Sequence, residues 1–182
     1  MLTYPLGDGA ELGSLEPWHA EQYLKTIDRC REHLKAEILS PHTVFTVDDA
    51  RQLLQSIADA HAADDQHLYG MWLAGELVGV VRLFNFDTGM RTCEIGVWVA
   101  PEFQGRGLVT KACRAVIAWA FQVRGMARVQ WRNSTTNVRS SAVARRLGMT
   151  MEGLLRSSWE VGGVRKDNEV WSVLADEWPT AA

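Results

Sequence analysis

A loop with two closely spaced glycines lies in the middle of the chain, between a largely apolar run and a helical pattern. The run at 95–99 stops before Pro101, and residues 104–107 read Gln-Gly-Arg-Gly before apolar residues recur at helical spacing. A strand, a tight loop and a helix N-terminus together present free backbone N–H groups, a geometry that binds phosphate. Glycines let such a loop approach a ligand closely because they carry no Cβ. The pattern therefore predicts a phosphate-binding loop.

Two commoner nucleotide-binding loops do not match this pattern. A P-loop requires a lysine followed by Ser or Thr after its last glycine, whereas Leu108 and Val109 stand here. The dinucleotide motif requires three glycines at fixed spacing, and only two are present. A two-glycine loop taken alone fits a plain strand-to-helix turn as well. The choice between a phosphate-binding loop and a plain turn therefore depends on the motifs in the rest of the chain and on their spacing.

The positions around the loop resemble the pyrophosphate-binding signature of the GNAT superfamily of acyl-CoA-dependent N-acyltransferases, Gln/Arg-x-x-Gly-x-Gly/Ala. This signature falls on Gln104, Gly107 and Val109, and Val109 departs from the usual Gly or Ala. Further along, Asn137 and Ser140, followed by the run 142–149, resemble the second CoA element of the family. These positions and the closing stretch at 160–178 are especially similar to the ribosomal-protein-serine acetyltransferase branch.

The resemblance implies a mixed α/β (α+β) GNAT acyltransferase fold, with a twisted, mostly antiparallel sheet of about seven strands flanked by helices. It implies one GNAT N-acetyltransferase domain over 1–182, with acetyl-CoA as co-substrate. The sheet would splay at the CoA site, so that the strand before the loop bonds the pantetheine arm through its backbone. The expected cofactor-binding residues are Val97, Trp98, Val99, Gln104, Gly105, Arg106, Gly107, Leu108, Val109, Thr110, Asn137 and Ser140. The alternative to the splay is a fully paired central strand. The alternative for Arg106 is a solvated surface side chain.

Acyl transfer to an amine needs a base, because a protonated amine cannot attack a thioester. Glu94 begins the strand at 93–99 and interrupts an otherwise apolar stretch. By resemblance, it stands where some family members carry their catalytic glutamate. An ordinary polar residue at a strand end is an equally good interpretation of Glu94. Histidines are further possible bases, although His61 lies on a helical face where structural roles are more common.

The departing thiolate needs a proton donor. Many GNAT enzymes use a tyrosine at the position that is Ala144 here, so the usual acid is absent. The serine-acetyltransferase branch places a serine near the sulfur, and this position matches Ser140. Capping of the following helix is the structural alternative for Ser140 and Asn137. No cysteine lies at a motif position, so we expect direct attack in a ternary complex rather than a covalent acyl-enzyme.

The amine acceptor is expected on the side opposite the cofactor, framed by the first helices, the 69–87 hairpin and the final hairpin. Carboxylates there would suit a cationic amine, and aromatic rings would suit a peptide or a planar group. The candidate acceptor-binding residues are Glu37, Phe84, Asn85, Asp87 and Trp159, with Glu160 beside them. The acceptor is either the N-terminal amine of a protein, such as a ribosomal protein, or a small amine, such as an antibiotic or an aminoacyl nucleotide. A non-catalytic acyl-CoA sensor is the alternative from another class.

The overall composition limits the partners. The net charge is −3 and no run of basic residues stands out, which argues against a nucleic-acid duplex. Cys30, Cys93 and Cys113 show no metal spacing, so we expect no metal and a reducing compartment, the cytoplasm. No apolar run approaches a membrane span, and no signal peptide opens the chain. Both a monomer and a homodimer remain open.

The elements that must position these residues follow from hydrophobic periodicity and from turn residues. Strands are expected at 11–15, 69–74, 77–86, 93–99 and 127–132, and on both sides of Gly162 and Gly163. Helices are expected from Pro17, in a second piece that ends near Pro41, after Thr46 as N-cap, along 108–119, and along 137–147 with Gly148 as the stop.

Overall fold

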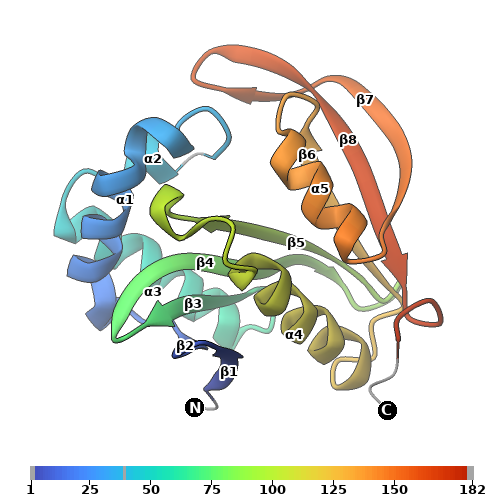
Figure 1. Ribbon diagram of the computed structural model, residues 1–182, viewed down its shortest axis with the longest axis horizontal. Helices are drawn as coiled ribbons and strands as arrows, with labels where there is room; N and C mark the ends of the chain where they lie inside the picture. Colours follow the sequence, from blue (N-terminus) through green and yellow to red (C-terminus); the bar gives the residue numbers. More distant parts are fainter. Residues whose placement is uncertain (1–2, 39, 180–182) are drawn as a thin grey trace.

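One sheet forms the frame of the protein (Figure 1). The structure is a computed structural model that describes residues 3–38 and 40–179. Within these residues eight strands follow the order β1-β2-β3-β4-β5-β6-β8-β7, and only β5 and β6 pair in parallel. The strands are β1 (Tyr4–Gly7), β2 (Ala10–Ser14), β3 (His67–Leu73), β4 (Glu76–Asp87), β5 (Thr92–Val99), β6 (Arg128–Ser134), β7 (Thr150–Val161) and β8 (Val164–Leu174). The expected mostly antiparallel mixed α/β sheet is confirmed, and β1, which the sequence patterns do not predict, adds the eighth strand.

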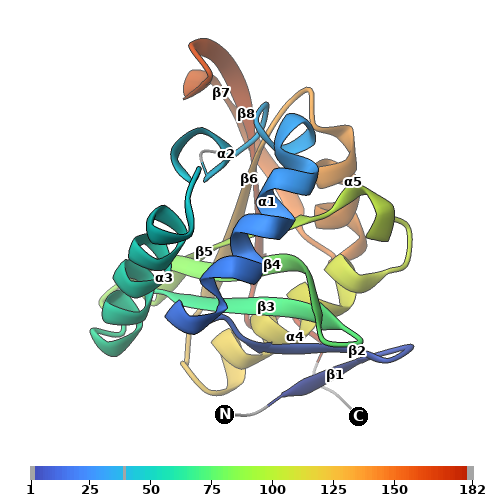
Figure 2. The ribbon, with the colours of Figure 1, turned by 90° about the vertical axis from the view of Figure 1, so that its left-hand side faces the viewer.

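Helices cover both faces of this sheet (Figure 2). The helices are η1 (Pro17–His19), α1 (Ala20–Leu34), α2 (Ser40–Thr43), α3 (Val47–Ala62), η2 (Pro101–Phe103), α4 (Leu108–Gln122) and α5 (Val138–Arg146). The apolar side chains of α1 and α3, such as Ile27 and Leu54, form one core with Trp72 and Val80 of the sheet. Those of α4 and α5 form a second core on the opposite face. The sheet therefore separates an α1/α3 face from an α4/α5 face.

The sequence analysis expects a second helical piece that ends near Pro41, and the structure differs from this prediction. Helix α1 ends at Leu34, and α2 begins at Ser40, so Pro41 lies in the first turn of α2. Proline is tolerated there because the first N–H groups of a helix have no intrahelical partner. Leu39, just before this helix, lies outside the described residues. The next helix begins as predicted, since Thr46 and Asp49 form a reciprocal capping box.

Strands β5 and β6 diverge along their length and open the sheet at its centre. Their parallel pairing runs only from Thr92 opposite Arg128 to Ile95 opposite Trp131. Beyond that point β5 stays paired with β4 on its other side, and β6 stays paired with β8. The edge of β5 that faces β6 therefore has no ladder partner beyond Ile95. This confirms the splay that the family resemblance implies.

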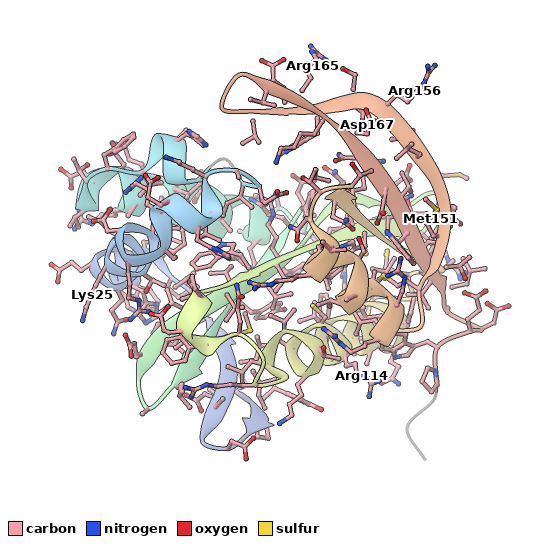
Figure 3. All side chains as sticks on the ribbon, turned by 45° about the horizontal axis from the view of Figure 1, so that its top comes forward. Lys25, Arg114, Met151, Arg156, Arg165 and Asp167 are labelled. Atoms are coloured by element: carbon pink, nitrogen blue, oxygen red, sulfur yellow. The ribbon has the colours of Figure 1, made fainter. Side chains whose placement is uncertain are left out.

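The β7–β8 hairpin arches beyond the rest of the sheet, and Figure 3 shows Arg156, Arg165 and Asp167 along its outer part. The pairing register shifts between Leu155 and Trp159, where Ser157 has a φ of 50°. Asp167 Oδ1 accepts from the Ser157 backbone N–H at 2.7 Å, and the Arg165 guanidinium donates to the Ser157 carbonyl at 3.0 Å. These bonds hold a β-bulge, which re-aims the side chains that follow it.

Candidate active site

A cleft of about 1890 Å³ lies between the diverging strands. Its walls come from β4 and β5, from β6 and α5, from the loop before α4, from the end of α1 and from the β7–β8 hairpin. Side chains alternate along β5: Ile95 and Val97 pack toward α4, whereas Trp98 packs against the α1/α3 core. Glu94 shares the alternation of Trp98 and thus faces the α1/α3 side. The cleft therefore has two differently lined faces.

The glycine loop has the backbone that phosphate binding requires. Gly105 and Gly107 have φ values of 78° and 75°, in the left-handed region that favours glycine. A Cβ built on either residue would meet no atom within 4 Å, so the space beside the loop is open. Gly107 is the N-cap of α4 and makes no side-chain cap bond, which leaves the first N–H groups of the helix for a ligand. These residues fit the pyrophosphate of a CoA.

Gln104 joins three parts of the molecule at the cleft. Its amide nitrogen lies 3.0 Å from His33 Nε2 of α1, and its carbonyl oxygen accepts from the Arg139 guanidinium of α5. Val109 and Thr110 line the cleft at the start of α4. The Arg106 side chain, by contrast, is exposed and lies over the Phe103 ring, with its Cζ 5.2 Å from the ring centroid.

The start of α5 brings the predicted pair Asn137 and Ser140 to the cleft wall. Asn137 is the N-cap of α5, and its side-chain oxygen accepts from the Ser140 backbone N–H at 3.1 Å. The Ser140 hydroxyl accepts from the Trp131 indole N–H at 3.0 Å. A hydroxyl that already accepts a hydrogen bond can still donate its own proton. The sequence analysis missed Trp131, which reads there only as an apolar residue of a strand.

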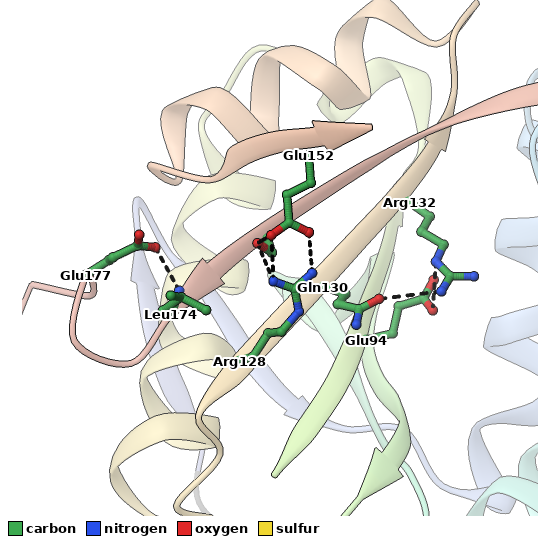
Figure 4. Close-up of polar contacts among 8 residues, drawn as sticks. Glu94, Arg128, Gln130, Arg132, Glu152, Leu174 and Glu177 are labelled. Atoms are coloured by element: carbon green, nitrogen blue, oxygen red, sulfur yellow. Dashed lines mark hydrogen bonds and ion pairs between the residues drawn. The ribbon is translucent and has the colours of Figure 1, made fainter. Parts of the chain in front are cut away.

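Glu94 lies almost enclosed in the cleft, with 14% of its side chain exposed, and Figure 4 shows it beside Arg132. Its Oε2 lies 3.7 Å from Arg132 Nε and accepts from the Asn85 amide at 3.3 Å. Burial raises the pKa of Glu94, and the Arg132 cation, the Asn85 hydrogen bond and the Arg82 cation oppose that rise. Asn85 reaches Glu94 from a bulge in β4, where its φ is 54°. This arrangement suits a carboxylate that accepts a proton.

Four of the five predicted acceptor residues line the cleft: Glu37, Phe84, Asn85 and Trp159. The Glu37 carboxylate is 3.0 Å from Lys166 Nζ, which also donates to the Ala36 carbonyl, so the end of α1 is joined to β8. Asp87 lies outside the cleft lining, because its carboxylate caps the β4–β5 turn through the Met90 N–H at 2.8 Å. Glu160, named beside these five, pairs with Arg165 on the exposed hairpin.

Several polar residues of the cleft are absent from the sequence predictions, among them Arg82, Arg132 and Asn168. Arg82 interrupts the apolar run of β4 in the way Glu94 interrupts that of β5, which is a signal that the sequence does carry. Asn168 is 7% exposed, and its Oδ1 has no hydrogen-bond partner among the described residues. An unpartnered buried acceptor costs about 1–3 kcal/mol, and this one belongs to a residue of the cleft wall.

The described part of the chain contains no group of three His, Cys, Asp or Glu side chains that could hold a metal ion. None of the helices in that part is long and apolar enough to cross a membrane.

Comparison with known proteins identifies the family. Residues 12–150 match the model of the Acetyltransferase (GNAT) domain. YdaF of Bacillus subtilis (strain 168), provisionally named a ribosomal N-acetyltransferase, is 31% identical over 98% of each chain. The ribosomal-protein-serine acetyltransferase of Escherichia coli (strain K12) is 23% identical over 96% of this chain and 97% of its own.

The structural similarity is equally extensive. A RimL ribosomal alpha-N-protein acetyltransferase, solved in complex with coenzyme A, superposes with a TM-score of 0.90 at 21% identity, covering 97% of this chain and 99% of that one. The expectations of an acyltransferase and of acetyl-CoA as its acyl donor are thereby confirmed. The chain belongs to the GNAT family of acetyltransferases.

Proposed function

We propose that this enzyme transfers the acetyl group of acetyl-CoA to the N-terminal amine of a protein, such as a ribosomal protein, by direct attack in a ternary complex. The divergence of β5 from β6 carries this proposal. It leaves backbone hydrogen-bonding groups for a thioester arm beside the α4/α5 face, while Glu94 faces the other side. Relatives named for ribosomal-protein acetylation support the choice of acceptor.

The free edge of β5 can bond an extended pantetheine arm as an added strand would. The glycine loop holds the pyrophosphate at the N-terminus of α4, with Gln104 and Thr110 beside it. A backbone N–H of the β5 edge stabilises the thioester oxygen as it gains negative charge. Val97, Trp98 and Val99 supply that edge. Acetyl-CoA supplies the acetyl group, and the chain supplies its orientation.

Glu94 accepts a proton from the ammonium group of the acceptor, which frees the nitrogen lone pair for attack. The new bond joins that nitrogen to the acetyl carbon, and the bond to sulfur breaks. The nitrogen gives up its second proton as the intermediate collapses. Ser140 takes up a proton while it donates its own hydroxyl proton to the departing sulfur, or it only donates a hydrogen bond to the thiolate. Trp131 orients that hydroxyl through its indole N–H. Phe84, Asn85 and Trp159 surround the acceptor on the α1/α3 face.

A small amine is the second candidate acceptor. The Glu37–Lys166 pair joins the end of α1 to β8 and so bounds the acceptor side of the cleft. A bounded site favours a compact molecule, such as an amino-acid conjugate or an aminoacyl nucleotide. The site is built within one chain, so both a monomer and a homodimer fit this proposal. The three cysteines are buried free thiols, which supports the expected cytoplasmic location.

The acceptor is tested by following CoA thiol release from acetyl-CoA. One arm uses a serine-starting peptide from a ribosomal protein, and the other uses a panel of small amines and aminoacyl nucleotides. The same peptide with a blocked N-terminus is the matched control. We expect release with the free peptide and none with the blocked one. Release with the small amines alone would replace the main proposal by the second candidate.

A further inference from the structure

A guanidinium group lies on the acceptor side of the cleft without a carboxylate at ion-pair distance among the described residues. Arg82 of β4 pairs with Gly96 of β5, and Phe84 pairs with Glu94, so Arg82 is on the same face as Glu94. A Cβ on Gly96 would lie 3.5 Å from Arg82 Nε and 3.3 Å from the Phe84 ring, so both side chains extend across this glycine. The Arg82 Cζ lies 4.1 Å from the Phe84 ring centroid. Glycine and phenylalanine together therefore fix the arginine on the cleft wall.

The carboxylates of this face are already engaged. Glu37 pairs with Lys166 at 3.0 Å, and Glu94 is within 3.7 Å of Arg132. Among the described residues Arg82 has no ion pair with a carboxylate, and the residue is exposed on the cleft wall, where Glu94 is the carboxylate that acts on its charge from a greater distance. A guanidinium without an ion-pair partner can form a charge-assisted, bidentate hydrogen bond with an incoming anion. The acceptor face is thus prepared for negative charge.

The position of Arg82 relative to Glu94 determines how far apart the amine and the anion of an acceptor can be. Arg82 pairs with Gly96, and Glu94 pairs with Phe84. Arg82 and Glu94 are therefore offset by two residues along the ladder. Two residues of an antiparallel strand span about 7 Å. The Arg82 guanidinium lies over the ring of Phe84, which pairs with Glu94, so it extends from its own position toward Glu94. An amine at Glu94 and an anion at Arg82 would therefore lie within about this distance of each other, which is the reach of an amino-acid or dipeptide skeleton.

We propose that Arg82 selects acceptors that carry a carboxylate or a phosphate group within about 7 Å of the reacting amine. This inference rests on the proposed function, because it requires the amine to lie at Glu94. It names acidic amines, and peptides with an acidic residue next to the N-terminus, as the preferred class. It also disfavours polyamines, whose second ammonium group would meet the guanidinium.

The simplest competing role for Arg82 is that of an electrostatic neighbour of Glu94, since its cation also opposes the rise in the pKa of Glu94. That role acts on the base and would affect every acceptor equally. Selection acts on the acceptor and would affect only acceptors that carry an anionic group. Matched acceptors that differ only in one charge therefore separate the two roles.

The test uses two acceptor pairs: serine-starting peptides with Asp or Asn as the second residue, and 4-aminobutyrate with its amide. The proteins are the wild type, Arg82→Gln, Arg82→Lys, and Arg51→Gln as a control for loss of an exposed arginine on α3. We expect kcat/KM of the wild type to favour the acidic member by about tenfold, as a charge-assisted hydrogen bond does. Arg82→Gln should remove this preference by raising KM for the acidic member alone, and Arg82→Lys should keep part of it.

An equal loss for acidic and neutral members in Arg82→Gln, with a shift of the pH profile for both, would overturn the inference. A preference for the acidic member in the peptide pair alone would identify the acceptor as a protein with an acidic residue near its N-terminus. A preference in the small-molecule pair alone would identify it as an acidic metabolite. Binding of the four acceptors to the CoA-saturated protein is measured in parallel. Equal affinity for acidic and neutral members would overturn the inference, whereas a tighter acidic member without any turnover would support it and overturn the proposed function.

Discussion

At the scale of single residues, the environment of Glu94 decides its chemistry. Burial favours the protonated form, while Arg132, Asn85 and Arg82 favour the ionised form, and the net result is a raised pKa. A carboxylate with a raised pKa is a stronger base than a surface glutamate, yet it ionises more readily than a fully buried and unpaired one. The nearby cations therefore keep the group usable as a base.

The raised pKa has a consequence for stability that can be measured. Because the folded state holds the proton more tightly, ionised Glu94 costs stability above its folded pKa and costs nothing below its unfolded pKa. We expect Glu94→Gln to raise the free energy of unfolding at neutral pH, and this gain should vanish as the pH falls below the unfolded value. Urea unfolding across this pH range measures it, with Glu11→Gln, an exposed strand carboxylate, as control. A gain that grows on acidification would contradict the assigned environment.

Ser140 and Trp131 make a second prediction at this scale. Ser140→Ala should lower kcat by about 10²-fold, the usual contribution of a positioned proton donor, with a small effect on acetyl-CoA binding. Trp131→Phe removes the indole N–H that holds the hydroxyl at 3.0 Å and should lower kcat less. An acyl donor with a more acidic thiol needs less protonation, so it should reduce both defects. An unchanged kcat in Ser140→Ala would show that Ser140 is not the proton donor and has only a structural role in α5.

At the scale of elements, two β-bulges direct side chains into the cleft. The bulge in β4 brings Asn85 to Glu94, and the bulge in β7 precedes Trp159. Each contains a non-glycine residue with positive φ, Asn85 at 54° and Ser157 at 50°. Such backbone costs about 1–3 kcal/mol and persists only where surrounding bonds hold it. Their positions beside the cleft suggest that the strain serves the acceptor site.

Asp167 offers a way to test the β7 bulge without touching the cleft. Asp167→Ala removes the bond to the Ser157 N–H at 2.7 Å and should cost about 1 kcal/mol of stability. The relaxed bulge should displace Trp159, so KM for the acceptor should rise while the Kd of acetyl-CoA stays unchanged. Steady-state kinetics and calorimetry measure the two quantities. Arg156→Gln, at an exposed residue of the same hairpin, is the control, and an equal rise in both constants would refute the acceptor role.

The glycine loop permits a matched comparison of two glycines. Gly107→Ala should cost about 1–2 kcal/mol and weaken acetyl-CoA binding, because its φ of 75° is unfavourable for a residue with a Cβ. Gly153→Ala is the control, since Gly153 has neither positive φ nor an atom within 4 Å of an added Cβ. Thermal unfolding and calorimetric titration with CoA measure both effects. Tight CoA binding by Gly107→Ala would remove the loop from the cofactor site.

At the scale of the whole molecule, local patterns predict more of the cofactor side than of the acceptor side. Gly105, Gly107 and the Asn137 cap are readable because each depends on its own neighbours in the chain. The contact of Arg82 with Gly96 depends on strand register, which a short sequence window does not specify. Asp87 lies outside the cleft lining for the same reason, since a bulge between Phe84 and Asp87 changes which side chains face the cleft.

The splay itself is a property of the whole sheet. It arises where β6 leaves β5 to remain paired with β8, and the residues that decide it are far apart in sequence. The family resemblance implies this divergence, whereas the apolar pattern of 95–99 alone fits a fully paired strand equally well. In the proposed function, the acyl donor and the acceptor would therefore bind on separate faces of the same cleft, which meet at Glu94 and the β5 edge.

Substitution of the base tests this division most directly. Glu94→Gln is measured for turnover with the preferred acceptor and for the Kd of acetyl-CoA in the same preparation. We predict a fall in kcat/KM of at least about 10²-fold with an unchanged Kd, because the base serves the amine and not the thioester. Turnover that survives the substitution undiminished, or a loss of acetyl-CoA binding of the same size, would contradict the account.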